Sequence, residues 1–142
     1  MSNEVIIDAK KLLFKEGQAA KKLYLIKSGE VLCLKSSNDR LIPVFRAQAQ
    51  DIIGENAMIN GSVYSYSAIA TERSQLIEIS ADNFSQILKD APEWLVDLTN
   101  TMISRFQQTA SLIAENRAIH PSIVSEEHFP SSLEVEFKKL LN

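Results

Sequence analysis

The stretch Gly54-Glu55-Asn56-Ala57-Met58-Ile59-Asn60-Gly61-Ser62-Val63-Tyr64-Ser65 lies between two apolar runs of the chain. Ile52-Ile53 leads into it and a new apolar alternation follows it. This order predicts a strand, a tight turn, one turn of helix, a loop and another strand. Gly54 allows the backbone to bend sharply and to approach a second group closely.

The short helix indicates which kind of ligand this stretch could bind. Its first turn leaves N–H groups pointing outward, and its dipole favours an anion there. Glu55 lies beside that position, where its carboxylate is expected to accept hydrogen bonds from a ligand hydroxyl. The local chemistry therefore indicates a pocket for a ligand that carries both a phosphate and a sugar. For the isolated Gly-Glu pair, the alternative is a surface turn with a solvated glutamate.

Composition limits the classes of protein to consider. At 142 residues the chain is expected to form one domain, or one domain with a short appendage. An apolar content of 45% with 23% charged residues is typical of a globular protein and not of a disordered one. The net charge of −3 argues against a nucleic-acid-binding surface. We see no apolar run long enough to cross a bilayer and no signal peptide, so no membrane association is expected.

Cys33 is the one cysteine of the chain, so it cannot form an internal disulfide. It lies in an alternating apolar pattern, which predicts a small buried side chain and not a reactive thiol. Without an oxidised disulfide framework, a cytoplasmic location is expected.

Short apolar runs separated by turn residues dominate the first eighty positions. Their spacing of roughly ten residues is typical of a β-sandwich or β-barrel. Pro43 cannot donate a hydrogen bond to a neighbouring strand, so its strand is expected to be an edge strand or to contain a bulge. The predicted strands are 5–7, 12–14, 23–26, 31–34, 41–45, 52–53, 67–70 and 76–79.

The periodicity then changes to that of helices. Ser80 is expected to start a short helix that continues to about Leu88, and Pro92 suits the first position of the next helix. From Glu93 to about Ile119 there is no proline or glycine, which predicts a helix about 40 Å long. Its apolar residues form two stripes: Leu95, Ile103, Phe106, Ala110 and Ile113, and Leu98, Met102, Thr109, Leu112 and Ile119. We expect the first to pack on the β-domain and the second on a partner helix in a homodimer; packing against the tail is the alternative.

Residues 120–142 are expected to form an appendage to a domain spanning 1–119. His120-Pro121 and Phe129-Pro130 indicate an irregular linker. The sequence Ser131-Ser132-Leu133-Glu134 is similar to a capping box, and an amphipathic helix follows it. Because a helix of about eleven residues is marginal alone, it must dock or fray. Its apolar residues are Leu133, Phe137, Leu140 and Leu141.

Several motifs in order give the chain a resemblance to a known family. Their residues are Phe14-x-x-Gly17, Leu23-Tyr24-Leu25-Ile26-x-x-Gly29-Glu30-Val31, Ile53-Gly54-Glu55-x-Ala57-Met58, Phe84, Ala91-Pro92 and Arg105-Phe106. The set resembles the cyclic-nucleotide-binding domain shared by catabolite activator protein and the regulatory subunits of cAMP-dependent kinase. The resemblance covers roughly Leu12 to Ala114. It implies an α+β fold, with an eight-stranded antiparallel β-roll (jelly-roll-like), short flanking helices and a long C-terminal helix that closes over the ligand.

The resemblance also implies roles for individual residues. Glu55 matches the glutamate that binds the ribose 2′-hydroxyl, and Asn56 and Ala57 match the residues whose amides hold the cyclic phosphate. Ser65 matches a phosphate-contacting serine of bacterial regulators, and Thr109 matches a threonine that contacts adenine. The implied binding residues are thus Gly54, Glu55, Asn56, Ala57, Tyr64, Ser65 and Thr109.

Two positions depart from the family pattern. Tyr64 stands where an arginine usually neutralises the phosphate, and Gln50 stands where a glycine is usual. Loss of a charge-assisted partner weakens phosphate binding by about 2 kcal/mol or more. Cyclic dinucleotides stay among the candidate ligands beside cAMP and cGMP, because some relatives of the bacterial regulators bind them without the arginine.

Two functional hypotheses follow. In the first, a regulatory module binds a cyclic nucleotide at Glu55 and signals through a partner protein, with no cofactor required. In the second, the domain is a scaffold that binds no cAMP, in which Tyr64 fills the pocket and protein–protein contacts carry the function. No catalytic constellation is visible, so no enzymatic activity is expected. His120 and His128 are expected to be solvated linker residues, so no metal site is predicted. The 23 residues past Ile119 are too few for a helix-turn-helix, so no DNA binding is expected.

Overall fold

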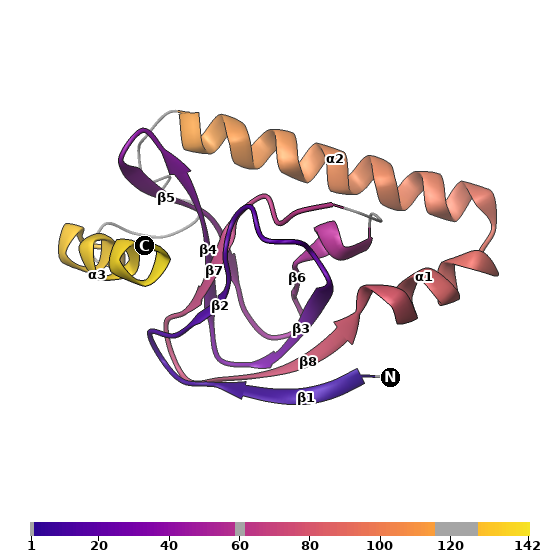
Figure 1. Cartoon of the computed structure of the whole chain (residues 1–142), viewed down its shortest axis with the longest axis horizontal. Helices are drawn as coiled ribbons and strands as arrows, with labels where there is room; N and C mark the ends of the chain where they lie inside the picture. Colours follow the sequence, from indigo (N-terminus) through magenta and orange to yellow (C-terminus); the bar gives the residue numbers. More distant parts are fainter. Residues whose placement is uncertain (1, 59–61, 116–127) are drawn as a thin grey trace.

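The computed structural model describes residues 2–58, 62–115 and 128–142 (Figure 1). The strands are β1 (Ser2–Ile7), β2 (Leu12–Phe14), β3 (Lys22–Ser28), β4 (Val31–Ser37), β5 (Arg40–Ala47), β6 (Ile52–Ile53), β7 (Ser67–Ala70) and β8 (Ser74–Ser80). The helices are the 3₁₀ turn η1 (Glu55–Met58), α1 (Ala81–Lys89), α2 (Glu93–Glu115) and α3 (Ser131–Leu141).

The strands form two four-stranded antiparallel sheets, in the orders β1-β8-β3-β6 and β2-β7-β4-β5. All eight apolar runs predicted from the sequence become strands, and the α+β fold with a β-roll is confirmed. Pro43 lies on β5, which is an edge strand, and the pairing of β5 with β4 shifts at that point. Cys33 pairs with Phe45 and Leu34 with Pro43, so Val44 is the extra residue of a bulge.

The main core fills the space between the two sheets. Cys33 is fully buried there, as predicted, and burial raises the pKa of its thiol well above the usual value. Side chains of β4 and β7 are buried along both faces. A strand covered on both faces needs a layer on each side of its sheet. The first sheet covers one side of these strands, and the C-terminal helix α3 packs on the other.

Helices α1 and α2 follow the last strand. Ser80 caps α1 by accepting a hydrogen bond from Asn83 N at 3.1 Å, as expected for a helix start. Pro92 precedes α2 and accepts from Leu95 N at 3.0 Å, so it lies one position before the helix. Figure 1 shows α2, in orange, running along one side of the roll. The predicted end of α2 near Ile119 lies outside the described residues.

The two stripes of α2 have different surroundings. Ile103, Ala110 and Ala114 are buried against the roll. The outward stripe is exposed, with Trp94 66% and Met102 62% accessible, together with Leu98 and Leu112. Helix α3 packs elsewhere and does not cover this stripe, and residues 116–127 of the tail lie outside the described residues, so packing of the stripe against the tail stays a prediction.

Helix α3 packs instead on the outer face of the second sheet (Figure 1). Phe129 and Phe137 are almost completely buried, with ring centroids 5.9 Å apart and ring planes tilted by 52°, in a cluster with residues of β4, β5 and β7. Docking therefore stabilises a helix that would be marginal alone. The sheet residues of this cluster are Leu32, Leu34, Leu41 and Ile69.

The capping box predicted at the start of α3 is wrong. Pro130 is the N-cap residue and makes no side-chain capping bond. Glu134 turns toward the sheet, where it accepts hydrogen bonds from Arg40 Nε and Leu41 N, both at 3.0 Å. Burial works to raise the pKa of Glu134, but these hydrogen bonds outweigh it and lower the pKa below its usual value. Glu134 therefore bonds to Arg40 and Leu41 of β5, where a capping box would have it bond to the start of its own helix.

His128 is not the solvated linker residue that the sequence suggested. Its Nε2 lies 2.7 Å from Oε2 of Glu30, a buried carboxylate that also accepts hydrogen bonds from Thr71 and Arg46. The contact joins the start of the terminal segment to the turn before β4. His120 lies outside the described residues.

Candidate functional site

A cavity of about 310 Å³ lies between the β-roll and α2. Strands β5 and β6 and the turn η1 form one side, and residues of α2, among them Ile103 of the buried stripe and Met102 of the exposed one, form the other. Its walls are mainly apolar and aromatic, and Glu55 is the one charged residue among them. The lining residues are Phe45, Ile52, Glu55, Met58, Thr99, Met102, Ile103 and Phe106.

Gly54 shapes the turn that presents Glu55. Its φ angle of +78° lies in the left-handed region, which residues with a side chain rarely adopt. A Cβ at this position would also lie 3.0 Å from the carbonyl oxygen of Lys22. Both constraints require glycine, and the chain then enters η1 as the sequence predicted.

Glu55 has one oxygen that is hydrogen-bonded and one that is not. Its Oε2 accepts a hydrogen bond from the hydroxyl of Tyr66 at 2.5 Å. Its Oε1 is screened from solvent and has no hydrogen-bond partner within the described part of the chain. Burial raises the pKa of Glu55, although the bond from Tyr66 opposes the shift. An unpaired, buried carboxylate oxygen is costly, and a ligand that donates a hydrogen bond would remove that cost.

Tyr66 connects this carboxylate to α2. Its side chain is fully buried, and its hydroxyl also accepts a hydrogen bond from Gly54 N at 2.8 Å. The ring meets Phe106 edge-on at 5.9 Å, and Phe106 meets Phe45 in the same way at 5.7 Å. The sequence analysis missed Tyr66. The alternation of Tyr64, Tyr66 and Ala68 could have indicated its position, because alternate residues of an extended segment point to the same face.

Tyr64, which stands at the arginine position of the family, lies in the core and does not line the cavity. Its ring stacks on Phe14 at 3.9 Å, and its hydroxyl donates a hydrogen bond to the carbonyl of Lys22 at 2.6 Å. The residue that stands at the family's arginine position is thus part of an aromatic pair in the core.

The remaining predicted residues of the turn support it from within. Ala57 N donates a hydrogen bond to the carbonyl of Gly54 at 3.0 Å. The side chain of Asn56 is buried and accepts from the hydroxyl of Ser65 at 3.2 Å, which ties η1 to the following loop. Of the predicted binding residues, Glu55 is therefore the one that lines the cavity.

Thr109 also lies apart from the cavity. It is exposed on α2, and its hydroxyl donates to the carbonyl of Arg105 at 3.0 Å. Thr99, ten residues earlier on the same helix, lines the cavity and donates to the carbonyl of Leu95 at 2.8 Å. The spacing of Thr99, Ile103 and Phe106 is the helical pattern that identifies this face.

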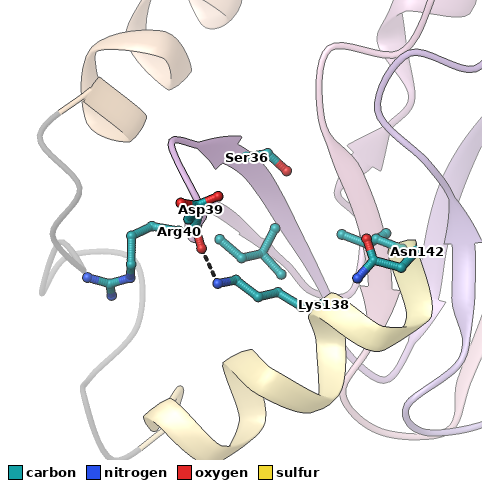
Figure 2. A pocket seen from close by; sticks show the side chains of 7 residues that line it. Ser36, Asp39, Arg40, Lys138 and Asn142 are labelled. Atoms are coloured by element: carbon teal, nitrogen blue, oxygen red, sulfur yellow. Dashed lines mark hydrogen bonds between the residues drawn. The ribbon is translucent and has the colours of Figure 1, made fainter.

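A second cavity, of about 510 Å³, lies between the β4–β5 hairpin and α3. Figure 2 shows Lys138 reaching from α3 to the carbonyl of Asp39. Arg40, which also lines it, forms an ion pair with Glu134. Because both cationic groups already have protein partners, this cavity is a weaker candidate than the one at Glu55.

Two negative findings concern the described ranges 2–58, 62–115 and 128–142. These ranges hold no group of three His, Cys, Asp or Glu side chains that could bind a metal ion. They also hold no helix long and apolar enough to cross a membrane.

Comparison with known proteins places this chain in a family. A family model described as the cyclic nucleotide-binding domain matches residues 4–91. No curated protein sequence matches the chain.

Solved structures share the fold. The cAMP-bound form of the EAL enzyme Bd1971 is 24% identical with a TM-score of 0.69; the match covers 79% of this chain but 30% of that one. The sensor domain of the regulator DNR from Pseudomonas aeruginosa is 21% identical with a TM-score of 0.63, covering 75% and 73% of the two chains. The c-di-GMP-responsive regulator CLP from Xanthomonas campestris is 17% identical with a TM-score of 0.61, covering 78% and 56%. With its glycine-glutamate turn inside the matched range, the chain belongs to the cyclic nucleotide-binding domain family.

Proposed function

We propose that this domain binds a cyclic nucleotide in the cavity between the β-roll and α2, and that its role is regulatory and not enzymatic. The observation that carries the proposal is the carboxylate of Glu55. It lies in the wall of a cavity of about 310 Å³, and its Oε1 has no hydrogen-bond partner in the described residues. Pockets for small ligands are typically apolar clefts of this size with a few convergent polar groups.

The ligand class is supported by the comparisons. The EAL enzyme Bd1971 is described in forms bound to cAMP and to cGMP, and CLP is described as responsive to c-di-GMP. We therefore take cAMP, cGMP and cyclic dinucleotides as the candidate ligands. We do not propose the activity of Bd1971 for this chain, because the match covers about 30% of that longer protein.

Signalling would proceed through α2. Phe106 lines the cavity and also packs against Tyr66, so a ligand in the cavity contacts both the roll and the helix. A ligand that binds one position of α2 more tightly than another shifts the population between them. The outward stripe of α2, with Trp94 and Leu98 exposed, is the surface through which a partner protein or a second copy would detect the change.

A second candidate function has its own support. Tyr64 is stacked on Phe14 in the core, and within the described part of the chain no basic side chain is among the residues that line the cavity. Both observations favour a scaffold that binds no cAMP and acts by protein–protein interaction. The two candidates differ in whether any nucleotide stabilises the protein.

Thermal unfolding of the full chain with cAMP, cGMP and c-di-GMP separates them. A ligand at 100 times its dissociation constant adds about 2.7 kcal/mol, which raises Tm by roughly 5–10 °C. Thr99→Phe fills the cavity and should abolish the response, whereas Thr109→Phe is the matched control outside the cavity and should retain it. If none of the three nucleotides raises Tm, the sensor proposal fails and the scaffold is favoured.

A further inference from the structure

The end of α1 and the first half of α2 carry an exposed apolar surface. Large side chains are accessible there, with 67% of Ile87, 66% of Trp94 and 62% of Met102 exposed. Trp94, Leu98 and Met102 are four residues apart, so they form one row along α2. Figure 1 shows α1 and α2 meeting at the edge of the molecule, on the side away from α3. We call residues 82–102 the α1–α2 corner.

The α1–α2 corner is also acidic. It holds four carboxylates, Asp82, Asp90, Glu93 and Asp97, and one lysine, Lys89, which gives it a charge of −3. The whole chain has a net charge of −3, so the charges outside the corner balance one another. All four carboxylates are exposed, and none of them forms an ion pair with another residue that the structure describes. The excess negative charge of the chain therefore lies beside the exposed apolar row.

Helix stability explains only two of these carboxylates. Asp82 and Glu93 lie in the first turns of α1 and α2, where the helix dipole favours a negative charge. Asp90 is the C-cap residue of α1, where the dipole disfavours one. Asp97 lies four residues after Glu93 on the same helix, and two like charges at this spacing repel each other. Asp90 and Asp97 therefore cost the free domain stability, and cations from a partner would remove that cost.

We propose that the α1–α2 corner binds a basic amphipathic helix of another protein. The apolar side chains of that helix cover Trp94 and Leu98, and its lysine or arginine residues pair with Asp90 and Asp97. A row of side chains four residues apart is a ridge of the kind that packs into the groove of a second helix. A second copy of this chain fits less well, because it brings the same charge of −3 against the corner. The inference rests on the proposed function, in which a partner contacts the outward stripe of α2, and it names the chemistry of that partner.

Trp94 is the one tryptophan of the chain, so its fluorescence reports on the α1–α2 corner. Quenching by acrylamide measures how accessible its side chain is in the full chain. We expect strong quenching, which decreases when a tryptophan-free leucine–lysine peptide with the period of an amphipathic helix is added. The same peptide with glutamate in place of lysine should leave the quenching unchanged. Titration of the fluorescence gives the dissociation constant of the lysine peptide.

Charge reversal tests the two carboxylates. Asp90→Lys combined with Asp97→Lys should weaken binding of the lysine peptide about tenfold or more and should allow the glutamate peptide to bind. The double variant is expected to fold, because both side chains are exposed and a lysine at the C-cap suits the dipole of α1. The matched control is Asp8→Lys combined with Glu72→Lys, which changes the charge equally outside the corner and should keep the affinity.

Three results would overturn the proposal. Weak quenching of Trp94 in the free chain would show that the chain itself or a second copy already covers the corner, and sedimentation equilibrium tells these two apart. Failure of the lysine peptide to bind would show that a basic amphipathic helix is not the partner. Equal affinity for the two peptides, or an equal loss in the two double variants, would show that the carboxylates do not select it. These titrations contain no nucleotide, so nucleotide binding is tested separately by the thermal unfolding above.

Discussion

The hydroxyl of Tyr66 lies 2.5 Å from Oε2 of Glu55. Glu55 is the residue to which the family resemblance assigns a ligand hydroxyl. The same hydroxyl accepts the hydrogen bond of Gly54 N, so one buried phenol holds the turn and its carboxylate together. Its ring also meets Phe106 of α2. Tyr66 therefore links the conformation of the site to the position of the helix.

Replacing Tyr66 by phenylalanine should destabilise the domain. The change leaves the amide of Gly54 and one more oxygen of Glu55 buried without partners, while the ring contacts survive. Loss of two such bonds costs about 2–3 kcal/mol, which lowers Tm by roughly 5–10 °C. Thermal unfolding followed by circular dichroism measures the change.

Tyr64→Phe is the matched control for that variant. Tyr64 is also buried, but its hydroxyl donates to a neutral carbonyl, that of Lys22. Its loss should cost about 1 kcal/mol. Equal losses for the two variants would show that the Tyr66–Glu55 bond has no special strength.

Glu55→Gln should stabilise the protein at neutral pH. Burial raises the pKa of Glu55 in the folded state above its usual value of 4.5, so its stabilising contribution is present below that value and is lost as pH rises through the folded pKa. When it is ionised, the buried, half-satisfied carboxylate is a cost that glutamine avoids. The expected gain is about 1 kcal/mol, as for other functional sites that trade stability for binding.

The sign of this effect is checked by repeating the unfolding at lower pH. The advantage of Glu55→Gln should shrink as pH falls through the raised pKa of Glu55 toward 4.5, because Glu55 in the unmodified protein then takes up a proton. Glu134→Gln gives the opposite pattern, because the bonds to Arg40 and Leu41 lower the pKa of Glu134. That variant should be less stable at pH 7, with the difference vanishing as pH falls below 4.5. A difference for Glu55→Gln that does not change with pH would contradict the assignment.

The fold could be predicted from the sequence because its signals are local. Alternation of apolar residues marked all eight strands, and the missing N–H of Pro43 located the edge strand and its bulge. Gly54 likewise predicted a sharp bend, and its φ angle lies in the left-handed region that other residues avoid. Each of these features depends on a residue and its immediate neighbours.

The contacts of the C-terminal segment and the site were harder to predict, because their interactions join distant parts of the chain. Glu134 matched a local capping pattern, yet Arg40, ninety-four positions away, binds it. His128 lay among linker residues in the sequence, and its partner Glu30 lies in a turn of the roll. Thr99 and Thr109 look equivalent on one helix, and only the position of the roll decides which of them lines the cavity.

Phe137→Ala should detach α3 or unfold the domain. Phe137 is fully buried between α3 and the outer face of the second sheet, and truncation of a buried phenylalanine costs about 3–5 kcal/mol. Leu140→Ala, on the exposed side of the same helix, should change the stability by about 0.5 kcal/mol or less. Denaturant titration measures both, and similar values for the two variants would contradict the observed docking of α3.

Gln50→Gly should stabilise the turn between β5 and β6. Gln50 has a φ angle of +75°, and its amide donates to the carbonyl of Ile26 at 2.8 Å, so the residue is held in the left-handed region. This conformation costs a residue with a side chain about 1–2 kcal/mol, and glycine gives back about 0.4–1 kcal/mol through the unfolded chain. The net gain of about 0.5–1 kcal/mol explains why a glycine suits this position. Gln48→Gly, in the same turn but without a positive φ, is the control and should destabilise the protein, as measured by thermal unfolding. A loss of stability in both variants would show that the left-handed conformation of Gln50 carries no strain.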